Sequence, residues 1–207
     1  MLCDRLGVSR TTLRHALRRL ADEGRVQSSA QRGWFVVDHL VSEPPSVLQS
    51  FTEMALARGL RPTAEVLERQ VRPASLDEAQ RLGVAPASAV LEIVRLRGLD
   101  DVPICIDRTI LVHARAEALA ETDLTDRSLH VLLQELEDIF VVRSSYAVRA
   151  GAADERVASL LKVDVGAPVL VGEDVSFGED DRPITLGTVT YRGDAYRFEA
   201  TLYRRKT

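Results

Sequence analysis

The sequence lacks the features that mark membrane-spanning, exported and disulfide-stabilised proteins. Its 207 residues contain no apolar run that approaches the ~18 residues of a transmembrane helix. The first residues do not show the charged-then-apolar pattern of a signal peptide. Only two cysteines occur, Cys3 and Cys105, and their wide separation argues against a disulfide framework. We therefore expect a cytoplasmic protein without a membrane partner.

Residue patterns of catalysis and metal binding are also missing. We find no nucleophile–base pair, no cluster of cysteines and histidines at metal-ligand spacing, and no phosphate loop of the form GxxxxGK[ST]. His113 and His130 stand alone, so we expect core or surface roles for them rather than a metal site, which needs several ligands. The sequence thus predicts no catalytic residues, no metal, no cofactor and no enzyme activity.

What the sequence does contain is an uneven distribution of charge. The net charge is −4, yet residues 1–41 hold seven arginines against four acidic residues. The rest of the chain therefore carries all of the negative excess. A basic head on an acidic body favours an anionic partner at the head, because charge distribution bears on partners rather than on fold. Chance unevenness of surface charge is the alternative explanation.

The basic head contains an amphipathic segment. Ser9 suits a helix N-cap, and leucines recur after it at helical spacing, which predicts a helix over residues 9–23 with arginines on another face. The stretches "GRVQSS" and "GWFVV" then indicate two short strands, and residues 2–6 resemble the end of an earlier helix. Helix, turn, helix and two-stranded wing is the order of a winged helix-turn-helix, whose second helix reads DNA. A solvated basic helix face is the alternative interpretation.

This head resembles a known family. The stretch "LGVSRTTLRHALRRLADEGRV", followed by "RGWFV", is similar to the DNA-binding domain of GntR-type bacterial transcription regulators. The resemblance implies that the second helix and the wing tip contact operator DNA through Ser9, Arg10, Thr11, Thr12, Arg14, Gln31, Arg32 and Gly33. The family's first helix has no counterpart, so we expect an incomplete winged-helix domain at residues 1–37. A late-assigned start codon, a trimmed chain and a natural truncation all remain open.

The remainder of the chain shows a linker and an internal repeat. Pro44 and Pro45 disfavour a helix, so we expect a linker at 38–46 and a second domain at 47–207. Residues 79–104 resemble residues 158–184, and each copy predicts a short helix, a strand, a turn and a second strand. Two such copies predict a duplicated α+β domain with a largely antiparallel sheet. Leucines at helical spacing predict one more helix, over 127–138, between the copies.

Two arginines distinguish the first copy from the second. Arg95 and Arg97 alternate along a predicted strand, so both side chains point to one face of the sheet. Their counterparts in the second copy are Asp174 and Ser176, so the fold itself does not require arginine at these positions. Two adjacent guanidinium groups repel each other. Their charge is compensated either by a carboxylate such as Asp107 or by a bound anion, which suits the guanidinium fork.

The second domain resembles the UTRA ligand-binding domain of the HutC-type subfamily of GntR regulators. The resemblance lies in "SFTEMALARGLRP" (50–62), "RLRGLDDVPICID" (95–107), "RSLHVLLQELE" (127–137) and "TYRGDAYRF" (190–198). It implies a chorismate-lyase-like fold and an effector sensor, often for phosphorylated sugars or other small anionic metabolites. The sensor of such a regulator changes the placement of the DNA-binding heads.

The same resemblance implies the effector-binding residues. Arg95 and Arg97 match the anion-binding arginines, and Asp107 stands where a carboxylate contacts ligand hydroxyls. Ser50, Phe51 and Thr52 match a loop that closes over the anion, and Ser128 matches a serine at a helix N-terminus, where an anion is favoured. His130 stands at a position that is Tyr in related sequences, and Tyr191 matches an aromatic wall. Thr185 stands where some sugar-phosphate sensors have Glu, so the part of the site that reads the rest of the ligand differs.

We therefore expect an α+β protein with a truncated winged helix-turn-helix head and an antiparallel-sheet UTRA domain. Its expected function is that of a DNA-binding transcription regulator, most often a repressor, which forms a homodimer and senses a small anionic metabolite such as a phosphorylated sugar. The alternative is a metabolite-binding protein, or a chorismate-lyase-like enzyme, with a vestigial head.

Overall fold

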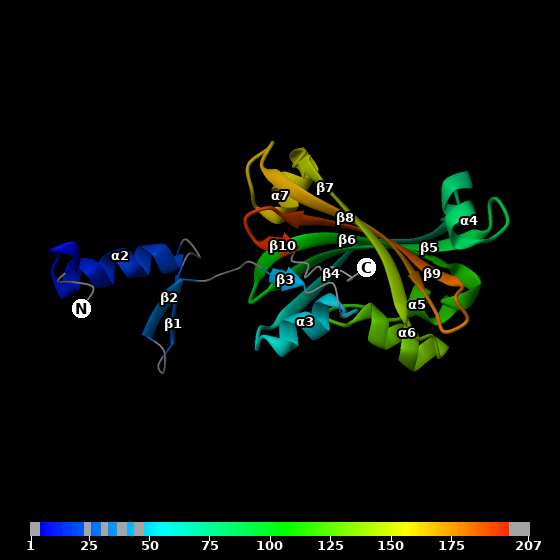
Figure 1. The fold of residues 1–207 in the computed structure, drawn as a ribbon, viewed down its shortest axis with the longest axis horizontal. Helices are drawn as coiled ribbons and strands as arrows, with labels where there is room; N and C mark the ends of the chain where they lie inside the picture. Colours follow the sequence, from blue (N-terminus) through cyan, green and yellow to red (C-terminus); the bar gives the residue numbers. More distant parts are fainter. Residues whose placement is uncertain (1–4, 23–25, 30–32, 37–40, 44–47, 199–207) are drawn as a thin grey trace, which may run out of the picture. The chain divides into compact units, whose positions relative to one another are not determined.

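The computed structural model describes residues 5–22, 26–29, 33–36, 41–43 and 48–198 (Figure 1). The chain divides into two compact units, an N-terminal unit of residues 1–39 and a C-terminal unit of residues 40–207. No helix within the described ranges is long and apolar enough to cross a membrane.

The N-terminal unit contains one long helix and a two-stranded wing. Helix α2 (Arg10–Asp22) begins after Ser9, whose carbonyl accepts a hydrogen bond from the Leu13 amide at 3.0 Å and whose hydroxyl accepts one from the Thr12 amide at 3.1 Å. Strands β1 (Val26–Ser29) and β2 (Gly33–Val36) pair in antiparallel fashion. Arg5 and Leu6 are also helical. The predicted helix and the two predicted strands are thus confirmed.

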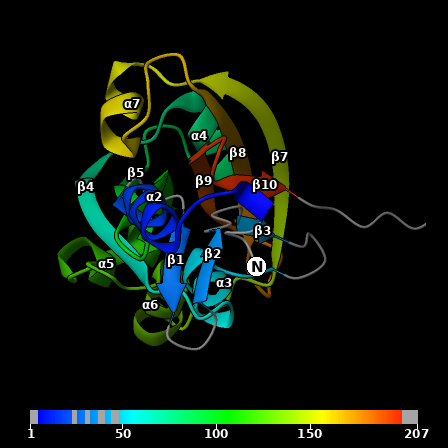
Figure 2. The same cartoon turned by 90° about the vertical axis from the view of Figure 1, so that its left-hand side faces the viewer.

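A six-stranded antiparallel sheet is the central element of the C-terminal unit. Its strand order is β4-β5-β6-β9-β8-β7, and Figure 2 shows β4 and β7 at its opposite edges. The sheet and the α+β class agree with the sequence prediction. The strands are β4 (Pro62–Pro73), β5 (Ala89–Leu99), β6 (Val102–Val112), β7 (Arg143–Ala152), β8 (Pro168–Phe177) and β9 (Pro183–Arg192).

The order of strands in the sheet follows from the internal repeat. One copy runs β4–α4–β5–β6 and the other β7–α7–β8–β9. Equivalent strands therefore follow in the same order from either edge of the sheet, and β6 and β9 pair at its centre. Helices α4 (Leu76–Leu82) and α7 (Glu155–Leu161) begin at Ser75 and Asp154, whose side chains accept hydrogen bonds from backbone amides of the first turn. Helix α4 packs against β9 and α7 against β6, so each copy contributes a helix to the other copy's strands.

The remaining helices lie on the other side of the sheet. Figure 1 shows α3 (Phe51–Ala57), α5 (Glu117–Glu121) and α6 (Leu129–Glu137) on the side opposite α4 and α7. A 3₁₀ turn, η1 (His113–Arg115), leads from β6 into α5. Leu132 and Leu133 of α6 are fully buried against Leu91 and Ile93 of β5, which anchors α6 on this face. Helix α6 thus confirms the prediction of a helix between the two copies.

A short parallel pair joins the two ends of the C-terminal unit. Strand β3 (Val41–Glu43) pairs with β10 (Tyr196–Phe198), and Figure 2 shows the two side by side. Strand β3 lies within residues 38–46, for which the sequence predicts a linker. Pro44 and Pro45, on which that prediction rested, lie outside the described residues.

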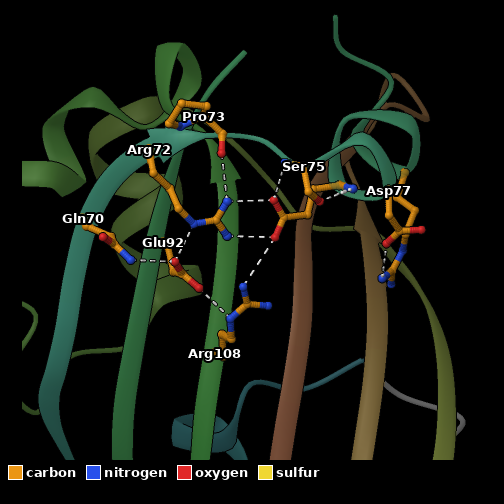
Figure 3. Close-up of polar contacts among 9 residues, drawn as sticks. Gln70, Arg72, Pro73, Ser75, Asp77, Glu92 and Arg108 are labelled. Atoms are coloured by element: carbon orange, nitrogen blue, oxygen red, sulfur yellow. Dashed lines mark hydrogen bonds and ion pairs between the residues drawn. The ribbon is translucent and has the colours of Figure 1, made fainter. Parts of the chain in front are cut away.

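A charged network binds β4, β5, β6 and α4 together on the side of α4 (Figure 3). The Glu92 carboxylate accepts hydrogen bonds from Arg72 Nε and Arg108 Nε, each at 2.6 Å, and from Gln70 Nε2 at 3.0 Å. The Glu78 carboxylate accepts hydrogen bonds from both terminal nitrogens of Arg72, each at 2.8 Å. These hydrogen bonds from Arg72 are the main reason that the pKa of Glu78 falls to about 2. Glu92 is 6% exposed, so its charge depends on these partners.

We predict that Glu92→Ala lowers the free energy of unfolding by roughly 3 kcal/mol, because it leaves two partly buried arginines without their carboxylate. Urea unfolding followed by circular dichroism measures the change. The matched control is Asp77→Ala, which removes an exposed carboxylate 3.6 Å from Arg81 and is expected to cost less than about 0.5 kcal/mol. Equal losses in the two variants would contradict a structural role for the network.

Candidate functional site

A cavity of about 270 Å³ opens within the C-terminal unit on the side of α3 and α6. Strands β5, β6, β7, β8 and β9 form its floor, and the starts of α3 and α6 and part of β10 form its walls. The structure brings eight of the nine predicted effector-binding residues to this cavity: Ser50, Phe51, Arg95, Arg97, Asp107, Ser128, His130 and Tyr191. The ninth, Thr52, does not line the cavity but contacts Arg97.

Two buried arginines and one carboxylate form one end of the cavity, which we call the arginine pole (Arg95, Arg97 and Asp107). Asp107 lies opposite Arg95 in the β5–β6 register, and Arg95 Nη2 donates to Asp107 Oδ2 at 2.5 Å. Arg97 Nη1 lies 3.8 Å from the same oxygen. The arginine side chains are only 3% and 5% exposed. One carboxylate therefore faces two guanidinium groups, and the pole keeps a net positive charge.

Arg97 is held in place by the first turn of α3. Its Nη2 donates to Thr52 Oγ1 at 2.8 Å, and its Cζ lies 4.6 Å from the centroid of the Phe51 ring, a cation–π arrangement. The prediction of a loop at Ser50–Thr52 was wrong about local structure, because Ser50 caps α3. The Ser50 hydroxyl accepts from the Glu53 amide while the Glu53 carboxylate accepts from the Ser50 amide, and this capping box starts a helix there.

Arg95 extends toward the start of α6. Its Nη1 donates to the Arg127 carbonyl at 3.4 Å, whereas its Nε is buried and has no hydrogen-bond partner among the described residues. Ser128 caps α6, and Ser128, Leu129 and His130 all line the cavity. The amides at a helix N-terminus favour a negative charge. Arg95 and this helix start therefore line the same cavity.

The electrostatics of the arginine pole follow from burial and proximity. Burial alone would raise the pKa of Asp107, but the charges of Arg95 and Arg97 outweigh it, so the pKa lies below its ordinary value. Burial, and then the charge of Arg95, lowers the pKa of Arg97. Burial also lowers the pKa of His130, so the imidazole is neutral at pH 7. The arginine pole thus offers a cavity ligand two guanidinium groups and one ionised carboxylate, and His130 adds a neutral imidazole to the cavity lining.

A second polar cluster, the Asp174 pole (Ser144, Asp174 and Ser176), lies on β7 and β8. Asp174 Oδ2 accepts from the Ser176 hydroxyl at 2.9 Å and from the Ser144 hydroxyl at 3.5 Å. All three residues line the cavity, together with Tyr146 and Thr185. Sequence reasoning treated Asp174 and Ser176 only as counterparts of the two arginines and missed Ser144 and Tyr146. The repeat carried the missing signal for the first two, because equivalent positions in the two copies face the same side of one sheet.

Glycine at position 187 makes room for the Asp174 carboxylate. Gly187 lies opposite Asp174 in the β8–β9 register, and a Cβ atom there would collide with Asp174 Oδ1 and lie 2.8 Å from Cγ. Gly172 plays the same part for Tyr146, since a Cβ atom at 172 would collide with the Tyr146 hydroxyl. Both side chains therefore lie flat across a neighbouring strand, which a larger residue would prevent.

Aromatic residues connect the cavity with β10. The ring of Tyr191, which lines the cavity, stacks on Tyr196 with 3.7 Å between ring centroids. Phe198 also lines the cavity and stacks on Tyr146 at 5.9 Å. Tyr196 and Phe198 both belong to β10. The strand that pairs with β3 therefore contributes directly to the cavity wall.

The predicted DNA-contacting residues are separate from the cavity. Ser9, Arg10, Thr11, Thr12 and Arg14 are all exposed at the start of α2, with the two arginines one turn apart. Gly33 begins β2, while Gln31 and Arg32 lie outside the described residues. Within the described ranges, no group of three histidines, cysteines or carboxylates is arranged to hold a metal ion.

Comparison with known proteins identifies two matching families. Residues 57–197 match the UTRA domain, and residues 1–36 match the bacterial regulatory proteins of the gntR family. The HTH-type transcriptional repressor NagR of Bacillus subtilis is 28% identical over 195 residues, which are 94% of this chain and 80% of that protein.

Solved structures agree with these matches. The crystal structure of PhnF from Mycobacterium smegmatis has a TM-score of 0.76 and 29% identity, covering 98% of this chain and 89% of that chain. The crystal structure of the effector domain of PhnF has a TM-score of 0.73 and 28% identity, covering 79% of this chain and 100% of that domain.

We predict that Gly187→Ala destabilises the protein by about 1–3 kcal/mol, because the added methyl group displaces the Asp174 carboxylate in a packed site. Urea unfolding of Gly187→Ala, Asp174→Ala and the double variant forms a thermodynamic cycle. The double variant is expected to be more stable than the sum of the single effects implies, because removal of the carboxylate relieves the collision. Strict additivity would show that the two residues do not interact.

Proposed function

We propose that this chain, which belongs to the UTRA-domain family and carries a GntR-type segment at residues 1–36, is an effector-controlled transcription repressor. In this proposal the cavity of the C-terminal unit binds a small anionic metabolite. The start of α2 and the β1–β2 wing contact operator DNA, and two copies of the chain act together as a homodimer on paired half-sites.

The relatives are named as transcription regulators rather than enzymes. NagR is a repressor by name, and so is PhnF, which is 29% identical over 206 residues. This favours a regulator over the alternative of a chorismate-lyase-like enzyme.

The charge imbalance at the arginine pole is the observation that carries the effector proposal. Two buried guanidinium groups share one carboxylate, and Arg95 Nε has no hydrogen-bond partner among the described residues. A buried charge without full compensation is costly, and a planar anion such as phosphate or carboxylate matches the guanidinium fork. The N-terminal turn of α6 adds backbone amides to the same region.

The pairing of β3 with β10 offers a route from cavity to head. Strand β3 follows the N-terminal unit directly in the chain, and Val41 pairs with Tyr196 while Glu43 pairs with Phe198. A ligand that shifts Tyr191 or Phe198 would alter β10 and thereby the start of the C-terminal unit. An effector changes DNA affinity in this way only if it binds the two arrangements with different affinities.

We predict that anionic metabolites raise the midpoint of thermal unfolding of this chain, because a ligand that binds only the native state stabilises it by mass action. A panel of sugar phosphates and carboxylates, screened by thermal shift and followed by calorimetry, tests this. Arg97→Gln should weaken binding of any hit roughly tenfold or more, since a hydrogen bond to a charged group contributes about 1.5–3 kcal/mol.

The matched control for the effector experiment is Arg149→Gln, which changes an exposed arginine on β7 that pairs with Glu173. This variant is expected to bind as the original chain does. If no anion in the panel protects the chain, or if Arg97→Gln binds a hit as tightly as before, the anionic effector is the wrong ligand class.

We predict that the chain binds duplex DNA with an affinity that falls steeply as salt rises, because phosphate contacts release counterions. Fluorescence anisotropy with a labelled duplex, repeated over a series of salt concentrations, measures the slope. Arg14→Ala should reduce the slope of log affinity against log salt by about 1, whereas Arg149→Ala should leave it unchanged. An unchanged slope in Arg14→Ala would remove that residue from the proposed interface.

A further inference from the structure

We propose that the Asp174 pole binds an ammonium group, and that the effector of this chain is therefore a small zwitterion with its anionic group at the arginine pole. This inference rests on the proposed effector-binding role of the cavity and adds to it the chemistry of the opposite end of the ligand.

The internal repeat makes the two poles directly comparable. In the first copy Arg95 faces Asp107 across β5 and β6, so the cation has its carboxylate in the protein. In the second copy the equivalent pair across β8 and β9 is Asp174 facing Gly187. A carboxylate takes the place of the arginine and a glycine takes the place of its partner. The second copy therefore holds an acid without the opposite charge that the first copy supplies.

Among the described residues, Asp174 has hydroxyl partners but no ion pair. Its carboxylate accepts hydrogen bonds from Ser176 and Ser144, and no lysine, arginine or histidine among the described residues forms an ion pair with it. Burial is the main reason that the pKa of Asp174 is raised, and the negative charge of Asp107 adds to it. The hydrogen bonds from Ser176 and Ser144 and the charge of Arg81, which forms no ion pair with Asp174, lower the pKa but do not outweigh burial. A carboxylate in such a place is stabilised in its ionised form by a cation that enters the cavity.

Two hydroxyl groups beside one carboxylate suit a primary ammonium group. An ammonium group carries three N–H donors. The Asp174 carboxylate is one acceptor, and the Ser144 and Ser176 hydroxyls, which donate to Asp174 Oδ2, keep lone pairs that can accept from the ammonium. A second anionic group at this end of the ligand would instead be repelled by Asp174. The pole therefore selects the sign of charge at this end of the ligand.

The spacing of the poles sets the length of the ligand. Strands β5 and β8 are separated by β6 and β9, and Asp174 is aligned through Gly187 and Thr109 with Ile93. Arg95 and Asp174 therefore lie three strand spacings and two residues apart, roughly 16 Å between Cα atoms in a flat sheet. The two charged groups of the ligand must stand several bonds apart to reach both poles. A compact α-amino acid, whose charges are separated by a single carbon, does not meet this requirement.

Matched pairs of probes test the proposal. The first pair is 4-aminobutyl phosphate and butyl phosphate, and the second is 6-aminohexanoate and hexanoate. Calorimetry on the full chain is expected to show about tenfold tighter binding of the amine in at least one pair, a difference of about 1.4 kcal/mol. In Asp174→Asn this preference should vanish while the affinity for the amine-free member stays the same.

The control variant is Glu173→Gln, which removes the neighbouring carboxylate on β8, one that pairs with Arg149. It should keep the full preference for the amine. Thermal unfolding checks that each variant is folded, and Asp174→Ser provides a second uncharged variant if Asp174→Asn is unstable.

The outcomes separate this inference from the proposed function. If the chain binds butyl phosphate or hexanoate but shows no preference for the amine, or if Asp174→Asn keeps that preference, the zwitterion proposal is wrong and the anionic effector stands. If the chain binds no member of either pair, the zwitterion proposal fails, and the panel of sugar phosphates and carboxylates decides separately whether the cavity binds an anion.

Discussion

The cross-strand ion pair between Arg95 and Asp107 is the interaction on which the cavity depends. It places a buried guanidinium on the floor of the sheet and leaves the adjacent Arg97 with a share of the same carboxylate. Arg97 is then supported from outside the sheet by Thr52 and the Phe51 ring. Because buried charges are tolerated only with partners, the positions of α3 and of the start of α6 are tied to these two side chains. The same arrangement leaves the net positive charge that makes an anion the natural ligand.

Duplication explains how one sheet came to hold two poles of opposite character. The two copies share strand order, helix placement and register, so equivalent residues point into the same cavity from opposite sides. Differences between equivalent positions then become differences between the two ends of the ligand site. Arg95 corresponds to Asp174, and Asp107 corresponds to Gly187, so the symmetry of the backbone supports an asymmetric distribution of charge. On the other face of the sheet, α4, α7 and the Glu92 network hold the strands without contributing to the cavity.

Much of this architecture could be predicted from residue patterns. Helical leucine spacing predicted α2 and α6, the repeat predicted the paired helices and strands, and the alternation of Arg95 and Arg97 predicted one shared face. The loop expected at Ser50–Thr52 is instead the start of α3, because the Ser50–Glu53 capping box starts a helix there. Ser144 and Tyr146 were missed because β7 is a largely exposed edge strand whose residues show no clear apolar alternation. Nothing in the local sequence marks which of its side chains turns toward the cavity.

The sequence by itself determined the family resemblance, the antiparallel duplicated sheet and the presence of an unusual arginine pair. The resemblance rests on continuous stretches of sequence, whereas the helices and strands depend on local propensity and periodicity, which neighbouring residues carry. Only the tertiary structure decided that Asp107 pairs with Arg95, that Thr52 supports Arg97, and that Asp174 shares a cavity with the arginines. The β5–β6 register places Asp107 opposite Arg95, and the start of α3 brings Thr52 to Arg97. The pairing of β6 with β9 at the centre of the sheet brings Asp174 to the same cavity as arginines about 80 positions away in the chain.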